Sequence, residues 1–149
     1  LLKAAYIYNF AKFVEWPAAS FNAPDSPLTI AIVGRDPMAE ALKTLEGKEV
    51  RGRRIAVFRW EHLEQSAPCH ILYIGSSERK NLGAIFKKVA AWDVLTVGAM
   101  EEFIHQGGII MFFLEKNKVR FEINPDMASW KKLHISSHLM RLSRSPEKN

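Results

Sequence analysis

The stretch "YIYNFAKFVEWP" near the start of the chain mixes apolar and polar positions at the period of a helix. Ile7, Phe10 and Val14 fall on one side of this helix, which we expect to pack on the core. Polar residues interrupt the stretch, and Pro17 ends it too early for a membrane span. The pattern therefore predicts an amphipathic core helix that runs up to this proline.

Four residues on the other side of that helix are candidates for a partner or dimer surface: Tyr8, Asn9, Lys12 and Trp16. Tyrosine and tryptophan combine an apolar body with a polar tip, and such aromatics are enriched in protein interfaces. Two interpretations remain open. Either a later loop of the same chain covers the two aromatic rings, or the four residues form a surface for another chain.

Further along the chain, runs rich in apolar residues predict strands, and stretches with helical periodicity lie between them. The predicted strands span residues 28–33, 53–60, 70–75 and 94–98. Predicted helices span residues 38–45, 76–89, 100–104, 126–133 and 136–143. Residues 109–124 are predicted to form two strands joined by a tight turn at Lys116–Asn117–Lys118.

Strands that alternate with helices are typical of an α/β fold. We therefore predict a mainly parallel sheet flanked by helices on both faces, with an antiparallel hairpin at one edge. Residues 1–149 are expected to form a single domain, because 149 residues can bury one core and nothing in the sequence suggests a second.

Polar residues follow two of the predicted strands. Arg35 and Asp36 follow the first strand, and Ser76, Ser77 and Glu78 follow the third. Ligands of open α/β sheets bind beyond the carboxyl ends of the strands, and helix N-termini there favour anions. These residues are therefore possible ligand-binding residues. The alternative is that they only cap helices and close turns, for which the same residue types are suited.

Composition and charge exclude few functions. The chain has 48% hydrophobic and 25% charged residues, which is typical of a globular protein, and a net charge of +5. The compact basic cluster is "KEVRGRR", with Lys48, Arg51, Arg53 and Arg54, and we interpret it as a solvated loop. It lacks the aromatic interleaving and motifs of nucleic-acid-binding proteins, so no nucleic-acid partner is expected.

No catalytic motif is present, and we predict neither an enzyme nor a resident cofactor. His134 and His138 are four residues apart but have no third ligand nearby, so no metal site is expected. Cys69, the single cysteine, precedes a buried strand and is interpreted as a packing residue.

Eight stretches in order resemble the YfiR-like family of bacterial periplasmic proteins. They are LKAAYIYNFAKFVEWP, LTIAIVGRDP, GKEVRGRRIAV, CHILYIGSSE, LTVG, GGIIMFF, VRFEIN and LHISSHLMRLS. The resemblance implies a regulator in the periplasm, with a signal peptide removed upstream. It implies repression of an inner-membrane diguanylate cyclase through that enzyme's periplasmic sensor region, which lowers cyclic di-GMP and biofilm formation.

The resemblance also implies partners: the cyclase domain, an OmpA-like outer-membrane lipoprotein that draws the repressor away, and a second copy in a homodimer. The alternative function is a sensor of a small molecule, a nucleotide or an aromatic amino acid. Its ligand would lie at the strand ends described above or near His134 and Ser136. Family members often pair a first-strand cysteine with the one before the third strand. Here that strand reads Ile30–Ala31–Ile32, and a second cysteine pair is missing too, so disulfide-based redox control is not expected.

Overall fold

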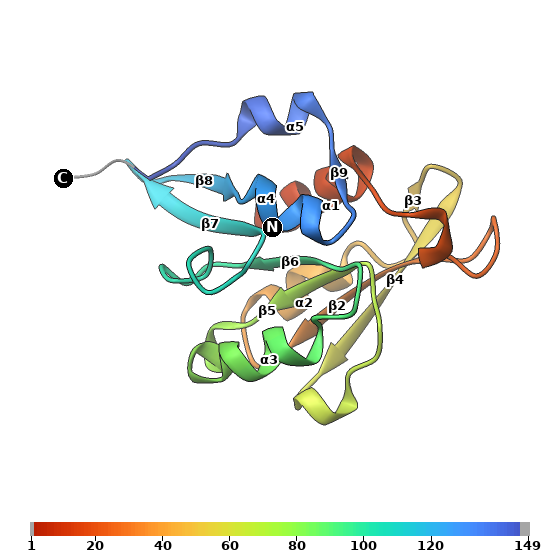
Figure 1. Ribbon diagram of the computed structural model, residues 1–149, viewed down its shortest axis with the longest axis horizontal. Helices are drawn as coiled ribbons and strands as arrows, with labels where there is room; N and C mark the ends of the chain where they lie inside the picture. The colour runs from red at the N-terminus through yellow and green to blue at the C-terminus, as the bar shows by residue number, and fades with distance from the viewer. Residues whose placement is uncertain (1, 147–149) are drawn as a thin grey trace.

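The computed structural model describes residues 2–146 (Figure 1). The first half of the chain contains α1 (Leu2–Phe13), β1 (Val14–Glu15), η1 (Ala18–Ser20), β2 (Leu28–Val33), α2 (Met38–Lys43), β3 (Glu49–Val50), β4 (Arg53–Trp60) and η2 (Leu63–Gln65). The second half contains β5 (Ile71–Ile74), η3 (Ser76–Asn81), α3 (Leu82–Lys88), β6 (Leu95–Gly98), β7 (Ile110–Glu115), β8 (Lys118–Ile123), α4 (Pro125–Trp130), β9 (His134–Ile135) and α5 (Ser137–Leu142). The η elements are short 3-10 helices.

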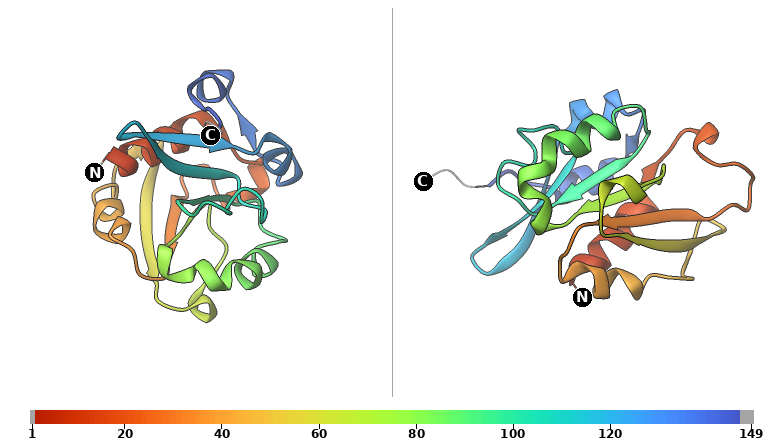
Figure 2. Two further views of the ribbon diagram at one scale, coloured as in Figure 1. Left: turned by 90° about the vertical axis from the view of Figure 1, so that its left-hand side faces the viewer. Right: turned by 90° about the horizontal axis from the view of Figure 1, so that it is seen from below.

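One curled sheet of seven strands organises the molecule (Figure 2). Its strand order is β3-β4-β2-β5-β6-β7-β8. The five strands from β4 to β7 in this order pair in parallel, whereas β3 and β8 are antiparallel to their neighbours at the two edges. A separate small sheet joins β1 to β9. The α/β class and the predicted hairpin edge are confirmed; the second antiparallel edge and the small sheet were not predicted.

The sheet separates two apolar cores, because successive side chains of a strand point to opposite faces. Ile30 and Ile32 of β2 belong to the first core, and Ala31 and Val33 belong to the second. Helices α1, α2, α4 and α5 contribute to the first core, and α3 contributes to the second. Helices thus pack on both faces, with most of them on one. That all of residues 1–149 form one domain stays a prediction.

The hairpin turn has the chemistry that its length requires. Lys116 and Asn117 have φ values of 50° and 64°, so both adopt the left-handed conformation of a two-residue turn. Such a turn matches the twist of the strands that it joins. The sequence prediction of strands around a turn at Lys116–Asn117–Lys118 is therefore confirmed, with Lys118 already in β8.

The opening helix ends earlier than predicted. It stops at Phe13, and residues Val14–Glu15 form β1, which pairs with β9 over His134–Ile135. Helical periodicity alone does not reveal this boundary, because the pairing joins segments about 120 residues apart in the sequence. Trp16 therefore does not lie on the helix with the other three candidate surface residues.

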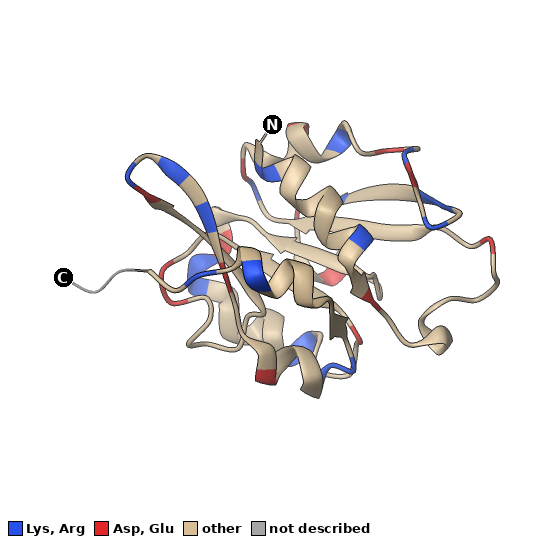
Figure 3. Ribbon diagram, turned by 90° about the horizontal axis from the view of Figure 1, so that it is seen from above, with Lys and Arg blue, Asp and Glu red and all other residues tan. Residues whose placement is uncertain are grey.

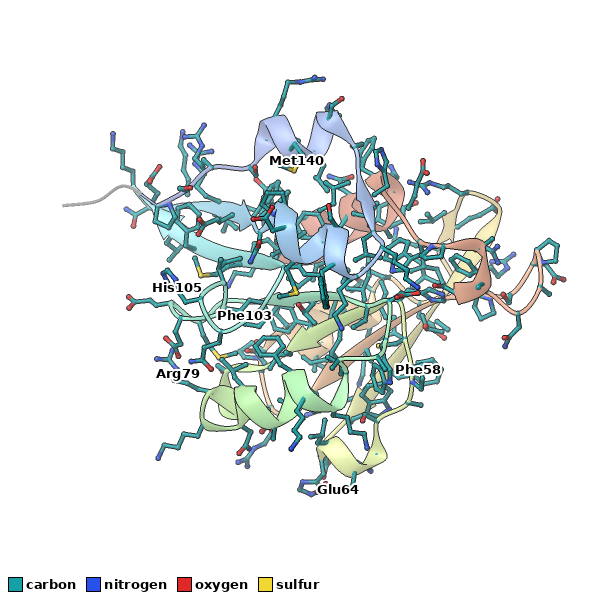
Figure 4. All side chains as sticks on the ribbon, viewed as in Figure 1. Phe58, Glu64, Arg79, Phe103, His105 and Met140 are labelled. Carbon is teal, nitrogen blue, oxygen red and sulfur yellow. The ribbon has the colours of Figure 1, made fainter. Side chains whose placement is uncertain are left out.

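Two further helix predictions are wrong. Residues 101–107 form turns instead of a helix; Phe103 N donates to Met100 O at 3.0 Å, and Gly108 N donates to Phe103 O at 2.8 Å. Phe103, labelled in Figure 4, is fully buried and packs against Phe86 of α3, with ring centroids 5.6 Å apart. The predicted caps of the helix after β5 are also wrong, because η3 intervenes and α3 begins only at Leu82.

Candidate functional site

The polar side of α1 is partly covered by the β3–β4 hairpin. The Tyr8 hydroxyl donates to the carbonyl of Glu49 at 2.8 Å, and the Arg51 guanidinium donates to the carbonyl of Lys12. The Nζ atoms of Lys12 and Lys48 lie 4.7 and 5.8 Å from the centre of the Tyr8 ring. Tyr8 is half-buried as a result, and cations surround its exposed edge.

Asn9 and Trp16 complete the predicted surface set. Asn9 is half-buried on α1, and Trp16 follows β1 and packs on its own chain. The indole Nε1 of Trp16 donates to the carbonyl of His70 at 3.0 Å. Trp16 nevertheless remains close to the hairpin, because it and Arg51 line the same groove.

This groove, which we call the hairpin groove, has a volume of about 330 Å³. It is lined by Ala11, Glu15, Trp16, Ala18, Phe21, Leu28, Val50, Arg51 and Arg53. Its walls combine aromatic rings with two guanidinium groups and one carboxylate. An apolar side chain with a polar neighbour therefore fits such a groove better than a purely charged group does.

The basic cluster is solvated, as predicted, because Lys48, Arg51 and Arg54 are exposed, but it forms the β3–β4 hairpin and not a loop, and its arginines bond within the fold. Arg53 Nη1 donates to the carbonyls of Ala23 and Ser26 at 2.9 and 2.8 Å, and its guanidinium lies 3.7 Å from the centre of the Phe21 ring. Arg54 donates to the carbonyl of Gly47 at 3.0 Å. These arginines hold the hairpin and the 18–27 loop in place. Acidic and basic segments are interleaved along the ribbon (Figure 3).

His70 is the centre of this arrangement. Its Nδ1 accepts a hydrogen bond from Thr29 N at 2.9 Å, and its Nε2 lies 2.8 Å from the carbonyl of Ser20. The Nε2–H tautomer of the neutral ring satisfies both contacts, since only an unprotonated Nδ1 can accept. Phe21 stacks on the ring with centroids 4.2 Å apart. Burial is the main cause that lowers the pKa of His70. The hydrogen bond to the Ser20 carbonyl raises this pKa, and the nearby charge of Arg53 lowers it further.

This lowered pKa makes stability pH-dependent. The unfolded chain protonates His70 near pH 6.5, whereas the folded protein does so only at lower pH. The stabilisation is therefore complete above pH 6.5 and is lost as the pH falls through the folded pKa. We expect the free energy of unfolding, measured by urea denaturation between pH 7.5 and 4.5, to fall more steeply for wild type than for His70→Gln. Equal slopes would rule out this role of His70.

The predicted residues at the strand ends do come together. Strands β2 and β5 are neighbours, and their connections leave toward β4 and β6 on opposite sides, which makes this the switch point of the sheet. Arg35 N donates to Ser77 Oγ at 2.8 Å, and Ser76 N donates to Asp36 Oδ2 at 2.9 Å. The other carboxylate oxygen of Asp36 accepts from Met38 N at 2.9 Å. The two loops thus bind each other.

An open depression of about 410 Å³ remains beside these loops, lined by Arg35, Arg59, Glu61, His62, Ser77 and Glu78. The side chains of Asp36 and Ser77 and the amide of Ser76 are engaged in holding the loops, and the side chains of Arg35 and Arg59 are cations that the depression presents. Asp36 and Ser77 thus close turns, as the turn interpretation holds, whereas neither serine caps a helix.

The other candidate ligand residues lie elsewhere. Ser136 Oγ accepts from Leu139 N at 3.2 Å and so caps α5, as its sequence context predicts. His134 is exposed and pairs with Glu15 in the small sheet. Trp16 follows β1, the strand that pairs with His134, and it contacts His70 just before β5. His134 and Ser136 therefore lie near the amino end of β5, whereas the switch point lies at its carboxyl end. The structure does not bring His134 and Ser136 together with the candidate ligand residues at the switch point.

Within residues 2–146, no group of three His, Cys, Asp or Glu side chains is placed to hold a metal ion. Nor is any helix of this part long and apolar enough to cross a bilayer. Cys69 is buried in the second core, and burial raises the pKa of its thiol to about 12. At neutral pH this side chain is therefore a protonated packing group, since the thiolate is the nucleophilic form.

Sequence reasoning missed Lys131, which is only 8% exposed. Its Nζ donates to the carbonyls of Val89, Ala90 and Trp92 at 2.7, 3.0 and 3.0 Å, beyond the end of α3. Burial lowers its pKa, and Asp93 opposes this effect. One signal was available, because Lys131 follows the buried Ala128 by three positions and so shares its side of the helix.

Comparison with known proteins agrees with the resemblance seen in the sequence. The model of the YfiR/HmsC-like family matches residues 1–144, which include α1, both sheets and α5. No curated protein matches the sequence significantly. The family match spans nearly the whole chain and is not confined to one motif. The chain therefore belongs to the YfiR/HmsC-like family.

Proposed function

We propose that the protein is a periplasmic regulator that binds the periplasmic sensor region of an inner-membrane diguanylate cyclase and represses the enzyme. Repression would lower cyclic di-GMP and biofilm formation, and an OmpA-like outer-membrane lipoprotein would compete for the repressor. The observation that carries this proposal is the family match over residues 1–144, which is consistent with a regulator of diguanylate cyclase signalling. In this proposal the protein acts by docking, as a homodimer, and not by catalysis.

The proposed docking surface joins α1 to the β3–β4 hairpin. Lys12, Lys48 and Arg51 supply cations around Tyr8, and the hairpin groove beside Trp16 supplies an apolar pocket of about 330 Å³. Interfaces concentrate binding energy where an aromatic or apolar anchor enters such a pocket, and complementary charge speeds the encounter. The partner surface expected here is therefore acidic and carries a protruding apolar side chain.

Reversing the charge of Lys12 tests this surface. Lys12 is exposed, so Lys12→Glu is expected to leave stability nearly unchanged but to weaken binding about 10-fold or more, a loss of about 1.4 kcal/mol. Adding Trp16→Ala opens the groove wall and should weaken binding further. Binding to the purified periplasmic domain of the diguanylate cyclase is measured by biolayer interferometry, and dimerisation is measured by light scattering.

The matched control is Lys87→Glu, an exposed charge reversal on α3 at the opposite face of the sheet. It should bind like wild type. Thermal unfolding of each variant separates binding from folding, which matters for Trp16 because its indole bonds to His70. If Lys12→Glu and the double variant both bind the cyclase domain and dimerise like wild type, this surface is not the docking site.

A small-molecule sensor remains the alternative function. The switch point offers the depression next to Arg35 and Arg59, but the side chains of Asp36 and Ser77 already accept hydrogen bonds from backbone N–H groups of the two loops. The geometry therefore favours the docking proposal.

A further inference from the structure

Strand β7 extends beyond the end of its parallel neighbour. β6 ends at Gly98 and pairs with only Ile110 and Met111, whereas β7 continues to Glu115. The β7–β8 hairpin accordingly projects past β6 (Figure 2). From Phe112 to Leu114, β7 is hydrogen-bonded in the sheet on its β8 side only.

The backbone of this segment presents bonding groups to the open side. On β8, the backbone C=O of Phe121 is directed away from β7, because it accepts a hydrogen bond from Arg144 N at 3.0 Å. Residues of an antiparallel pair face inward or outward together and alternate along the strand. Phe112 is paired with Phe121, so its backbone N–H and C=O are also directed away from the partner strand. The same holds for the backbone groups of Leu114, two residues further along β7. Within residues 2–146, the Leu114 amide has no recorded partner on that side.

A cavity of about 570 Å³ runs along this edge. It is lined by Met111, Phe112, Phe113 and Leu114 in succession, and by Lys3, Ala99, Glu101 and Pro146. Successive side chains of a strand point to opposite faces, so four consecutive lining residues show that the cavity follows the backbone edge and not one face. The Leu114 side chain is 69% exposed beside it.

The two outer edges of the sheet, in contrast, are covered by hydrogen bonds to other segments of the chain. On β4, Ile55 N donates to Lys48 O at 2.8 Å, and Val57 N donates to the carboxylate of Glu46 at 2.5 Å. On β8, the segment around Arg144 bonds to the strand. Proteins blunt strand edges in such ways because an open edge pairs with other chains. Among residues 2–146, neither kind of cover lies on the β7 edge between Phe112 and Leu114.

We propose that this β7 slot, the backbone edge of residues 112–114 with Lys3, Ala99 and Glu101 around it, binds an extended segment of a partner protein as an added strand. Main-chain hydrogen bonds supply the affinity, as in other cases of strand addition. The charges of the lining specify the segment: apolar residues at alternate positions, an acidic side chain facing Lys3 and a basic one facing Glu101. The slot lies at the opposite edge of the sheet from the hairpin groove and does not depend on cyclase repression.

The test uses a phage-displayed library of random linear heptapeptides, selected on the wild-type protein. The key variant is Leu114→Pro, which removes the N–H that faces the slot and no bond to β8. Leu114→Ala is the matched control, because it shortens the side chain and keeps the N–H. We expect selected peptides with the stated pattern to bind Leu114→Ala within about threefold of wild type and Leu114→Pro at least 10-fold more weakly. A selection that yields no such peptides, or peptides that bind Leu114→Pro as well as wild type, overturns the proposal.

Hydrogen exchange of the Leu114 amide provides a second measurement, which decides the question even if Leu114→Pro does not fold. The amide should exchange rapidly in the free protein and slowly with a selected peptide bound. Slow exchange in the free protein would mean that the protein itself fills the slot. Light scattering would then identify a second copy by its mass, and a monomer would identify a segment of the same chain; either result overturns the proposal.

Discussion

Replacing Phe103 by alanine is expected to lower the free energy of unfolding by about 3–5 kcal/mol, the usual cost of truncating a fully buried phenylalanine. Phe103 is 0% exposed and lies between two backbone segments that only glycine allows to approach. A Cβ atom added to Gly98 would lie 2.7 Å from its ring, and one added to Gly108 would lie 2.3 Å away. The loss leaves a cavity that these rigid segments fill poorly.

The same contact predicts a non-additive pair. Gly108→Ala alone should destabilise strongly, because its methyl group collides with the ring of Phe103. In the double variant the ring is gone, so the combined loss in urea denaturation should be smaller than the sum of the single losses. Gly83→Ala on α3 is the control, since nothing lies within 4 Å of its Cβ position. Additive losses would contradict the packing described here.

Lys131→Met is the second variant with a large expected effect, a loss of about 3 kcal/mol in the free energy of unfolding. Methionine fills a similar volume but supplies no donor. The Val89 carbonyl still accepts from Trp92 N at 2.9 Å, whereas the part-buried carbonyls of Ala90 and Trp92 lose their donor, and each unsatisfied group costs about 1–3 kcal/mol. The wild type already bears the cost of burying the Lys131 ammonium group, which the variant avoids. The expected loss is therefore smaller than the summed cost of the unsatisfied carbonyls.

The neighbouring residue supplies the control for this variant. Lys132 is exposed, and its φ of 62° is equally strained for lysine and for methionine. Lys132→Met should therefore change the free energy of unfolding by less than about 0.5 kcal/mol. Comparable losses from the two variants in urea denaturation would show that the three carbonyl contacts do not stabilise the fold.

The two lysines also show where sequence patterns stop being informative. In "SWKKL" nothing in the composition distinguishes Lys131 from Lys132. The difference arises because Lys131 continues the buried side of α4 and meets the carbonyls beyond the end of α3, about 40 residues earlier in the chain. Trp16 is a similar case. It was predicted on the opening helix, but it follows the separate strand β1, and its indole bonds to the carbonyl of His70.

Most of the architecture followed from local patterns in the sequence. Apolar runs located β2, β4, β5 and β6, and the hairpin was predicted together with its turn. The sequence also located Arg35, Asp36, Ser76 and Ser77 at the carboxyl ends of predicted strands. That these loops bond to each other follows from the adjacency of β2 and β5, which the structure shows. The match of the family model over residues 1–144 includes these stretches.

By itself, then, the sequence determined the fold class, most strands, the family and the polar residues at the strand ends, because the periodicity of apolar residues is a local property of the chain. Only the tertiary structure decided that β1 pairs with β9, that His70 and the arginines are engaged within the fold, and that β7 extends past the end of β6. Each of these depends on which distant segments meet and on where one strand ends beside another. Hydrogen bonding between such segments satisfies backbone groups whose partners no local pattern can name.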